Sequence, residues 1–327
     1  MLTTGLPRIQ IAHLPTPLER LERLAAHLGG PRLLVKRDDQ TGLATGGNKA
    51  RKLEFLVGQA LAGRADVLVT GGAAQSNHAR QTAAAAAKAG LRSVLVLRGA
   101  EPPLRTGNLL LDELLGAEIR WCGKSDLGPA LEEAAEDLWN HGARPALIPY
   151  GGSNPVGAAG YVAAMEELMA QLETMSEQVT AIVFATSSGG TQAGLVVGAR
   201  ALGFGGRVLG ISVDKPKGDL SVHVAGLAGE TAAYLGQSLV ISPDEIEVND
   251  DYLGGGYAVI GDPEREALKL FARTEGLLLD PVYTARAAAG LIDLIKKGHF
   301  ARQDTVLFWH TGGTAGLFGF GPEVLES

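Results

Sequence analysis

Short apolar runs recur along the whole chain, and each is followed by a longer amphipathic stretch with helical period. The runs are rich in Val, Ile or Leu and are bounded by Gly or polar residues, which is typical of strands buried on both faces. Strands are predicted at residues 32–36, 66–70, 93–97, 117–121, 146–149, 181–185, 208–213 and 305–309. Such strands need covering helices on both sides, so the chain is constrained to an α/β fold.

The intervening stretches place apolar residues at helical spacing. Helices are predicted at residues 18–28, 48–61, 76–89, 129–140, 155–172, 191–202, 263–275 and 285–297. Repeated strand–helix alternation implies right-handed crossovers and mostly parallel sheets. In such folds ligands bind in the loops at the carboxyl ends of the strands. The segments that follow the strands are therefore where a functional site is expected.

Composition narrows the class of protein further. A chain of 327 residues, 46% hydrophobic and 20% charged, is globular and forms one large or two ordinary domains. The net charge of −7 offers no basic surface for nucleic acid. Cys122 is the only cysteine, which excludes an intrachain disulfide and favours a reducing compartment. No run of about 18 uncharged apolar residues occurs, so we expect a cytoplasmic protein with no membrane contact.

The first loop of interest, KRDDQTGLATGGNKARK at residues 36–52, presents Lys49 at the start of a helix. The helix dipole disfavours a cation at this position. One interpretation is a solvated lysine beside Arg51 and Lys52. The other is a lysine whose pKa is lowered by neighbouring cations and burial, which would make it a nucleophile toward a carbonyl. The loop alone leaves both interpretations open.

The second loop, TGGAAQSNHAR at residues 70–80, again runs from a strand through glycines into a helix. Gln75, Ser76 and Asn77 are expected at the helix N-terminus, where free backbone N–H groups favour a carboxylate or a phosphate. Plain N-capping by Ser76 explains the same pattern. We interpret His78 as a residue of the helix and not as a ligand.

The third loop, TSSGGTQAG at residues 186–194, directly follows the buried run AIVFA. Its residues Ser188, Gly189, Gly190 and Thr191 form a cradle suited to a phosphate group. The chain has no G-x-G-x-x-G, and its Gly-Lys-Ser at 123–125 has Glu118 where a P-loop needs glycine. A phosphate carried by something other than a nucleotide is favoured. No H-E-x-x-H or cysteine cluster is present, so no metal site is expected.

Two later segments, LDPVYTA at residues 279–285 and WHTGGTAG at 309–316, complete the set of loops. Tyr283 is either a packed aromatic residue or an acid/base group in the cleft. The second segment follows the last predicted strand, which is again where ligands bind.

Five segments in order resemble one enzyme family: KRDDQTGLATGGNKARKLEF, GGAAQSNHARQTAAAAAKAG, SSGGTQAG, LDPVYTARAAAGLIDLI and HTGGTAGLF. The family is that of D-cysteine desulfhydrase and 1-aminocyclopropane-1-carboxylate deaminase, and the resemblance covers residues 14–320. It implies pyridoxal phosphate as cofactor and a tryptophan-synthase-β-type fold of two open, twisted, mostly parallel sheets with helices on both faces. It also implies a large domain of residues 1–52 and 161–327, a small domain of residues 53–160, and a homodimer.

Carried over residue by residue, the resemblance makes Lys49 the Schiff-base lysine. Ser76 and Tyr283 join it as catalytic residues, with Tyr283 near the reacting carbon. Contacts with the cofactor are implied for Lys52, Asn77, Ser188, Gly189, Gly190, Thr191 and Thr284, and contacts with the substrate carboxylate for Gln75, Ser76 and Asn77.

Thr284 distinguishes between the relatives. The aminocyclopropane deaminases have Glu after this Tyr, and a carboxylate would keep the pyridine nitrogen of the cofactor protonated for opening an unactivated ring. A hydroxyl need not do so, and the weaker carbanion stabilisation still suffices for β-elimination of a thiolate. The favoured reaction is therefore the conversion of D-cysteine to pyruvate, hydrogen sulfide and ammonia.

Other functions remain as alternatives. L-cysteate sulfo-lyase is similar over the KRDDQTGLATGGNK and HTGG segments, and the sequence separates neither thiolate from sulfite nor D from L substrates. The deaminase and a non-catalytic pyridoxal-phosphate-binding protein are less favoured. A nucleotide-dependent oxidoreductase on a similar sheet is disfavoured because the dinucleotide fingerprint is missing.

Overall fold

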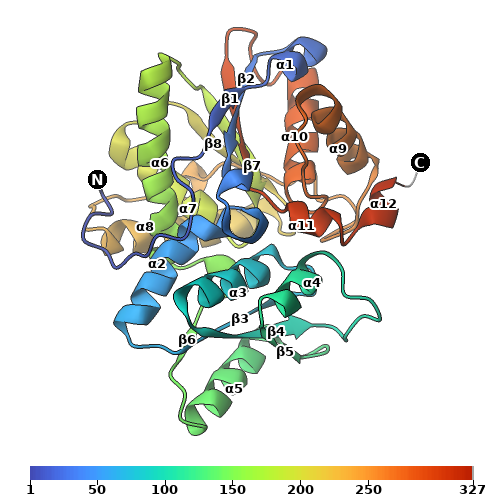
Figure 1. The fold of residues 1–327 in the computed structure, drawn as a ribbon. Coiled ribbons are helices and arrows are strands. Elements are labelled where there is room, and N and C mark those ends of the chain that lie inside the picture. Colours follow the sequence, from blue (N-terminus) through green and yellow to red (C-terminus); the bar gives the residue numbers. More distant parts are fainter. Residues whose placement is uncertain (326–327) are drawn as a thin grey trace.

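Two separate β-sheets form the frame of the protein in the computed structural model, which describes residues 1–325 (Figure 1). The six-stranded sheet has the order β1 (Leu18–Arg20), β2 (Arg32–Arg37), β10 (Thr305–His310), β7 (Ala181–Thr186), β8 (Arg207–Ser212) and β9 (Val248–Asn249). The four-stranded sheet has the order β5 (Glu118–Trp121), β4 (Arg92–Arg98), β3 (Val67–Ala73) and β6 (Pro145–Leu147). Neighbouring strands run parallel, apart from the antiparallel pair β1–β2. The predicted α/β class with two mostly parallel sheets is confirmed.

Helices cover both faces of both sheets. They are α1 (Glu22–Leu28), α2 (Lys49–Ala62), α3 (Asn77–Ala89), α4 (Gly107–Leu114), α5 (Leu127–Asn140), α6 (Pro155–Met175), α7 (Gly190–Leu202), α8 (Lys217–Tyr234), α9 (Asp262–Glu275), α10 (Thr284–Lys296), α11 (Thr314–Leu317) and α12 (Gly321–Leu325). Single turns of 3₁₀ helix occupy Asp38–Gln40, Leu43–Thr45, Tyr150–Gly152 and Pro243–Glu245. None of the helices in residues 1–325 has the length and apolar character that crossing a membrane requires.

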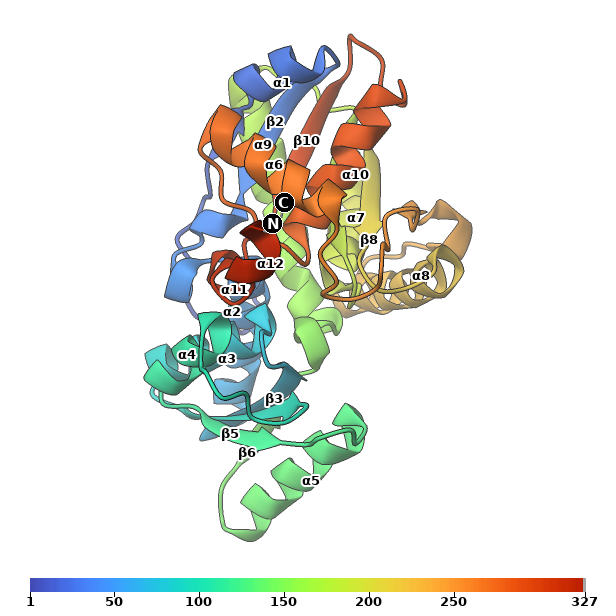
Figure 2. The ribbon, with the colours of Figure 1, turned by 90° about the vertical axis from the view of Figure 1, so that its right-hand side faces the viewer.

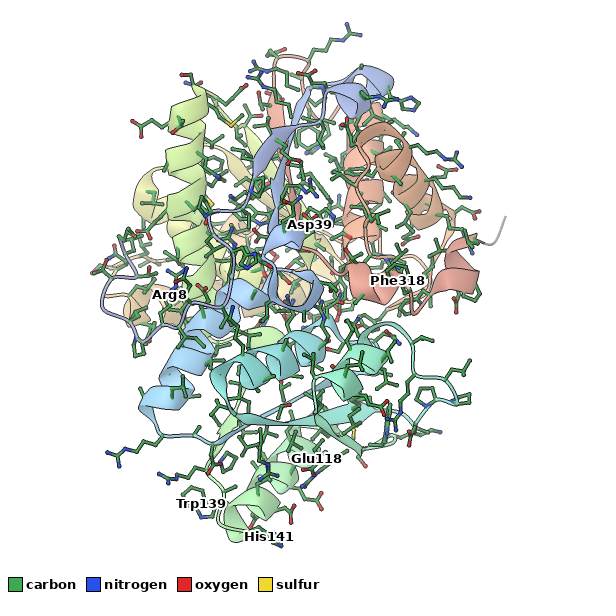
Figure 3. The ribbon with its side chains drawn as sticks, viewed as in Figure 1. Arg8, Asp39, Glu118, Trp139, His141 and Phe318 are labelled. Atoms are coloured by element: carbon green, nitrogen blue, oxygen red, sulfur yellow. The ribbon has the colours of Figure 1, made fainter. Side chains whose placement is uncertain are left out.

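The six-stranded sheet has a core on each side, because successive strand residues point to opposite faces. Leu33 and Val35 pack against α1, α9 and α10, while Leu34 between them packs against α6, α7 and α8. Figures 1 and 2 show these two helix layers on either side of the sheet. The four-stranded sheet is covered by α5 on one face and by α3 and α4 on the other. In Figure 3, Trp139 and His141 at the end of α5 mark the tip farthest from the six-stranded sheet.

All eight predicted strands are present, but the prediction of a helix from residue 18 was wrong. Leu18–Arg20 forms β1, because its backbone pairs with residues 34–36 of β2, and the helix begins only at Glu22. Helices α4, α8, α11 and α12 were not predicted. Three glycines lower the helix propensity of α8, and packing of its buried face compensates for them.

The four-stranded sheet uses strands from residues 67–147 only, and the six-stranded sheet uses strands from both sides of this block. The domain limits expected at 52/53 and 160/161 fall inside α2 and α6. These two helices pack against each other and carry the chain between the two sheets.

A buried carboxylate ties α2 and α6 to the six-stranded sheet. Asp38, at the end of β2, accepts hydrogen bonds from Arg51 Nε at 2.9 Å, Tyr161 Oη at 2.6 Å and Trp309 Nε1 at 2.8 Å. Burial alone would raise the pKa of Asp38, but the Arg51 cation outweighs it and the pKa lies below its usual value. Arg51 also donates to Glu167 of α6. One ion network therefore joins four elements that are distant in the sequence.

This network predicts a large effect for a small substitution. Asp38→Asn leaves the buried Arg51 with one carboxylate fewer, and we expect the free energy of unfolding to fall by about 3–5 kcal/mol. Urea denaturation followed by circular dichroism measures it. Glu118→Gln, which removes an exposed partner of Arg120, is the matched control and should cost at most about 1 kcal/mol. Equal losses in the two variants would contradict the assigned importance of the network.

Candidate active site

One pocket lies where the loops after β2, β3, β7 and β10 converge between the two sheets. Figure 3 places Asp39, which follows β2, in this central region. Seven of the predicted site residues line the pocket: Lys49, Ser76, Asn77, Ser188, Gly189, Thr191 and Tyr283. Lys52, Gln75, Gly190 and Thr284 lie outside this lining. The lining also includes Asn48, His78, Tyr150 and Thr311.

Two glycines bring Lys49 to the pocket. A Cβ on Gly46, whose φ is 71°, would lie 1.9 Å from the Asp39 carbonyl oxygen, so only glycine permits this turn. Gly47 passes so close to Gly312 that a Cβ on the latter would lie 2.5 Å from the Gly47 Cα. Lys49 then begins α2, and its Nζ donates to Asn48 Oδ1 at 2.9 Å.

The environment of Lys49 favours its neutral, nucleophilic form. Burial lowers the pKa of Lys49, the Asp280 carboxylate opposes this shift and the Arg80 cation adds to it, and the result is a pKa of about 8. A lysine with a pKa near 8 has a substantial neutral fraction at physiological pH, which is what attack on an aldehyde requires. Lys49 is half-buried in the pocket lining, which favours the nucleophile over the solvated surface lysine as the interpretation of this residue.

Lys52, one turn further along α2, is a buried cation in need of an anion. Its Nζ donates to the Gly151 carbonyl oxygen at 3.1 Å and to Ser153 Oγ at 3.4 Å, and within residues 1–325 no carboxylate lies in ion-pair range of it. Burial lowers the pKa of Lys52 well below its usual value, and the Lys49 cation lowers it further. A Cβ on Gly190 would lie 3.0 Å from this Nζ, so Lys52 faces the N-terminus of α7.

The N-terminus of α7 provides the rest of an anion site. Gly189 adopts a φ of 82°, and a Cβ there would lie 2.9 Å from the His223 ring. Ser153 Oγ accepts from the Gly190 N–H at 3.1 Å and donates to Ser188 Oγ, while Asn48 Nδ2 donates to Thr191 Oγ1 at 3.0 Å. Free N–H groups, the helix dipole and the ammonium of Lys52 together suit a phosphate dianion.

The start of α3 supplies hydroxyl and amide groups on the opposite wall. Ser76 is the N-cap residue, and its Oγ accepts a hydrogen bond from the Ala79 N–H at 3.1 Å, as the capping interpretation predicts. This bond leaves the hydroxyl proton of Ser76 available for donation. Asn77 lines the pocket beside it. The side chain of Gln75 instead donates to the Thr106 carbonyl and accepts from the Asn108 N–H, both at 2.9 Å. It satisfies the N-terminus of α4, and so it does not reach the pocket.

His78 lines the pocket as a neutral side chain. Thr70 Oγ1 gives its proton to the Ile148 carbonyl oxygen and therefore accepts from His78 Nε2 at 2.9 Å. Burial, with the Lys49 and Lys52 cations adding to it, lowers the pKa of His78 well below its usual value. No group of His, Cys, Asp and Glu side chains suited to a metal ion occurs within residues 1–325.

Tyr283 closes the pocket as a protonated phenol. Burial raises its pKa well above the usual value, and the neighbouring phenol of Tyr257 raises it further. The two hydroxyl groups lie 2.8 Å apart. Tyr257 belongs to the glycine-rich segment YLGGGYA, and its part in the site was not predicted because nothing in that segment links it to Tyr283, 26 residues later.

Asp280 is a second residue that the sequence analysis missed. Its carboxylate accepts from the backbone N–H groups of Val282, Tyr283 and Thr284 and from Thr284 Oγ1, at 2.7–3.2 Å. These four bonds fix the turn that carries Tyr283. They also hold Thr284, which is fully buried behind the pocket wall. The segment LDPVYTA contained the signal, since Asp often caps a following turn.

Comparison with known proteins identifies the class. Residues 9–312 match the family described as pyridoxal-phosphate dependent enzyme, and the chain belongs to this family. Its cofactor is therefore pyridoxal phosphate. A solved structure described as "Crystal Structure Analysis of the ACC deaminase homologue" matches with a TM-score of 0.92 and 40% sequence identity, over 99% of this chain and 97% of the other. The buried, uncompensated Lys52 at the α7 N-terminus and the low pKa of Lys49 fit the phosphate and the aldehyde of this cofactor.

The low pKa of Lys49 is directly measurable. Reductive methylation of the cofactor-free protein with formaldehyde, quantified for each lysine by mass spectrometry, should show Lys49 becoming reactive with a midpoint near pH 8, because only the neutral amine reacts. In Asp280→Asn the midpoint should move lower, since the opposing negative charge is gone. A midpoint near the ordinary value of 10.5 would contradict the burial assigned to this amine.

Proposed function

We propose that this enzyme eliminates the β-substituent of a small amino acid, with D-cysteine as the substrate. Cysteine and water give pyruvate, hydrogen sulfide and ammonia. The observation that carries the proposal is the composition of the pocket wall: within residues 1–325 it contains Lys49, hydroxyls and amides but no Asp or Glu. Thr284 stands where the aminocyclopropane deaminases resembled by this chain have Glu.

Pyridoxal phosphate supplies part of the chemistry, and the residues of the pocket supply the rest. Bound pyridoxal phosphate supplies a ring that withdraws electrons from the substrate and makes its α-hydrogen acidic. In the proposal, Lys52 and the N-terminus of α7 from Ser188 to Thr191 hold the phosphate, and Asn77 donates to the ring hydroxyl. Lys49 would hold the aldehyde end of the cofactor through its amine.

Proton movement is assigned to Lys49 and Tyr283. Once released, Lys49 has a neutral amine that accepts the α-proton, which its pKa of about 8 permits near neutral pH. Tyr283 remains protonated because its pKa is raised, so it is a donor to the departing sulfur, and Tyr257 supports it through the bond between their hydroxyls. Ser76 and Asn77, which line the pocket, would bind the substrate carboxylate.

A ring-opening deaminase is the second candidate, because the 40% identical structure is described as that of an ACC deaminase homologue. Opening an unactivated cyclopropane needs a stronger electron sink than loss of a thiolate. The Asp280 carboxylate is committed to four donors of its own turn, and Thr284 contributes a hydroxyl. These features favour elimination over ring opening.

L-cysteate is the other alternative substrate, with sulfite as leaving group. A sulfonate is permanently anionic and calls for a cation beyond the one that acts on the α-carbon. Lys49 is the only Lys or Arg in the pocket lining within residues 1–325. A thiol is therefore the preferred leaving group in this proposal. We further propose a cytoplasmic homodimer, which the family resemblance and the single cysteine support.

Lys49→Ala tests the proposed role of the lysine. We expect the visible absorbance of the bound cofactor to disappear and pyruvate release to fall by at least ~10²–10⁴-fold, because both the attachment point and the base are lost. Lys124→Ala, which removes an exposed lysine far along the chain, is the control and should change neither. Retention of the absorbance band in Lys49→Ala would refute the assignment.

A substrate panel tests the proposed reaction. The wild-type enzyme should release pyruvate and sulfide from D-cysteine with a higher kcat/KM than pyruvate and sulfite from L-cysteate, or pyruvate from L-cysteine. Aminocyclopropane carboxylate should give little 2-oxobutyrate, because the strong electron sink is missing. Faster 2-oxobutyrate formation than pyruvate formation would identify the enzyme as a deaminase.

A further inference from the structure

Asn108 lies beneath the pocket and touches one of its walls through a single side-chain amide. It is the second residue of α4, is fully buried, and is absent from the pocket lining. Helices α3 and α4 pack side by side (Figures 1 and 2), which brings Asn108 between Arg80 and Asn77. Its three contacts are Arg80 Nε at 3.1 Å, the Gln75 carbonyl oxygen at 3.0 Å and Asn77 Oδ1 at 2.9 Å.

These contacts determine how the amide of Asn77 is oriented. A guanidinium only donates hydrogen bonds, so the Asn108 atom facing Arg80 must be its oxygen. The Asn108 nitrogen then faces the other way and donates to the Gln75 carbonyl, which only accepts, and to Asn77. The Asn77 atom that receives this bond must be Oδ1. Its Nδ2 is therefore turned away from Asn108.

Asn77 Nδ2 points toward the loops of the pocket. A Cβ on Gly313, in the loop after β10, would lie 2.8 Å from this nitrogen, and Asn77 itself lines the pocket. Without Asn108, either end of the Asn77 amide would present equally well to the pocket, because the oxygen and the nitrogen are similar in size.

Arg80 is itself held in place by hydrogen bonds, and it therefore fixes the orientation of the Asn108 amide. The fully buried guanidinium donates from Nη1 to the carbonyl oxygens of Ala44 and Gly46, in the loop that leads to Lys49. The Asp112 carboxylate, one turn after Asn108 in α4, favours the charged form of the Arg80 guanidinium by raising its pKa. The same guanidinium thus positions both the loop before Lys49 and the amide beside Asn77.

We propose that Asn108 is a positioning residue which, held by Arg80, fixes Asn77 as a hydrogen-bond donor to the cofactor. The inference rests on the proposed contact between Asn77 and the ring hydroxyl of pyridoxal phosphate. It adds that this contact is determined from α4, on the far side of Asn77 from the pocket.

Asn108→Asp is the sharpest test, because it keeps the shape and the bond to Arg80. Both of its outer atoms only accept, so Asn77 must turn its Nδ2 toward Asp and its oxygen toward the pocket. Titration of the cofactor-free protein with pyridoxal phosphate should show a Kd raised roughly 10- to 100-fold, with a shifted absorbance maximum of the bound cofactor. Glu113→Gln, an exposed change in the same helix, should leave both unchanged.

A double-mutant cycle separates positioning from general damage. In an Asn77→Ala background, Asn108→Asp should raise the Kd little further, since the group that it reorients is gone. An equal effect in both backgrounds, or wild-type affinity and absorbance in Asn108→Asp alone, would overturn the proposal. Retention of the visible absorbance band in Lys49→Ala, or faster formation of 2-oxobutyrate than of pyruvate by the wild-type enzyme, would instead refute the proposed function, so the two failures are distinguishable.

Discussion

The buried ion network around Asp38 and Arg51 is the constraint on which the site depends. Arg51 lies between Lys49 and Lys52 in α2, and its side chain reaches back to Asp38 at the end of β2 and to Glu167 of α6. Residues three apart in a helix share a face, so anchoring Arg51 on the sheet side turns both lysines toward the pocket. The rotation of α2, and with it the position of the reactive amine, is set by an interaction that makes no contact with the ligand.

The arrangement that results brings two buried lysines close together, and the Asp280 carboxylate offsets only part of the lowered pKa of Lys49. Burial lowers the pKa of both lysines, the Arg80 cation acts in the same direction on Lys49, and the Lys49 cation does so on Lys52. Groups perturbed in this way destabilise an empty site and are characteristic of functional ones. A phosphate at the α7 N-terminus would pair with the buried charge of Lys52. An aldehyde would react with the neutral amine of Lys49. The same electrostatic features that lower the pKa values of the two lysines therefore favour the binding of pyridoxal phosphate.

Much of this arrangement was predictable from the sequence, because it depends on local patterns. Apolar runs identified eight strands, and glycine-rich turns after four of them located Lys49, Ser76, the phosphate loop and the segment after β10. What the sequence could not supply are contacts set by tertiary packing. Gln75 turned out to serve α4, Leu18–Arg20 became a strand because β2 lies beside it, and Tyr257 and Asn108 meet the site only through folding. No local pattern distinguishes such residues from their neighbours.

In the proposed site the cofactor is attached to Lys49, while Lys52 remains an unmodified cation beside its phosphate. Borohydride reduction of the protein loaded with pyridoxal phosphate makes that attachment permanent, and peptide mapping by mass spectrometry then locates it. Both lysines lie in the segment NKARK, so fragmentation spectra must resolve them. We expect the pyridoxyl group on Lys49 alone. Its appearance on Lys52, or on a lysine outside the pocket, would contradict the claim.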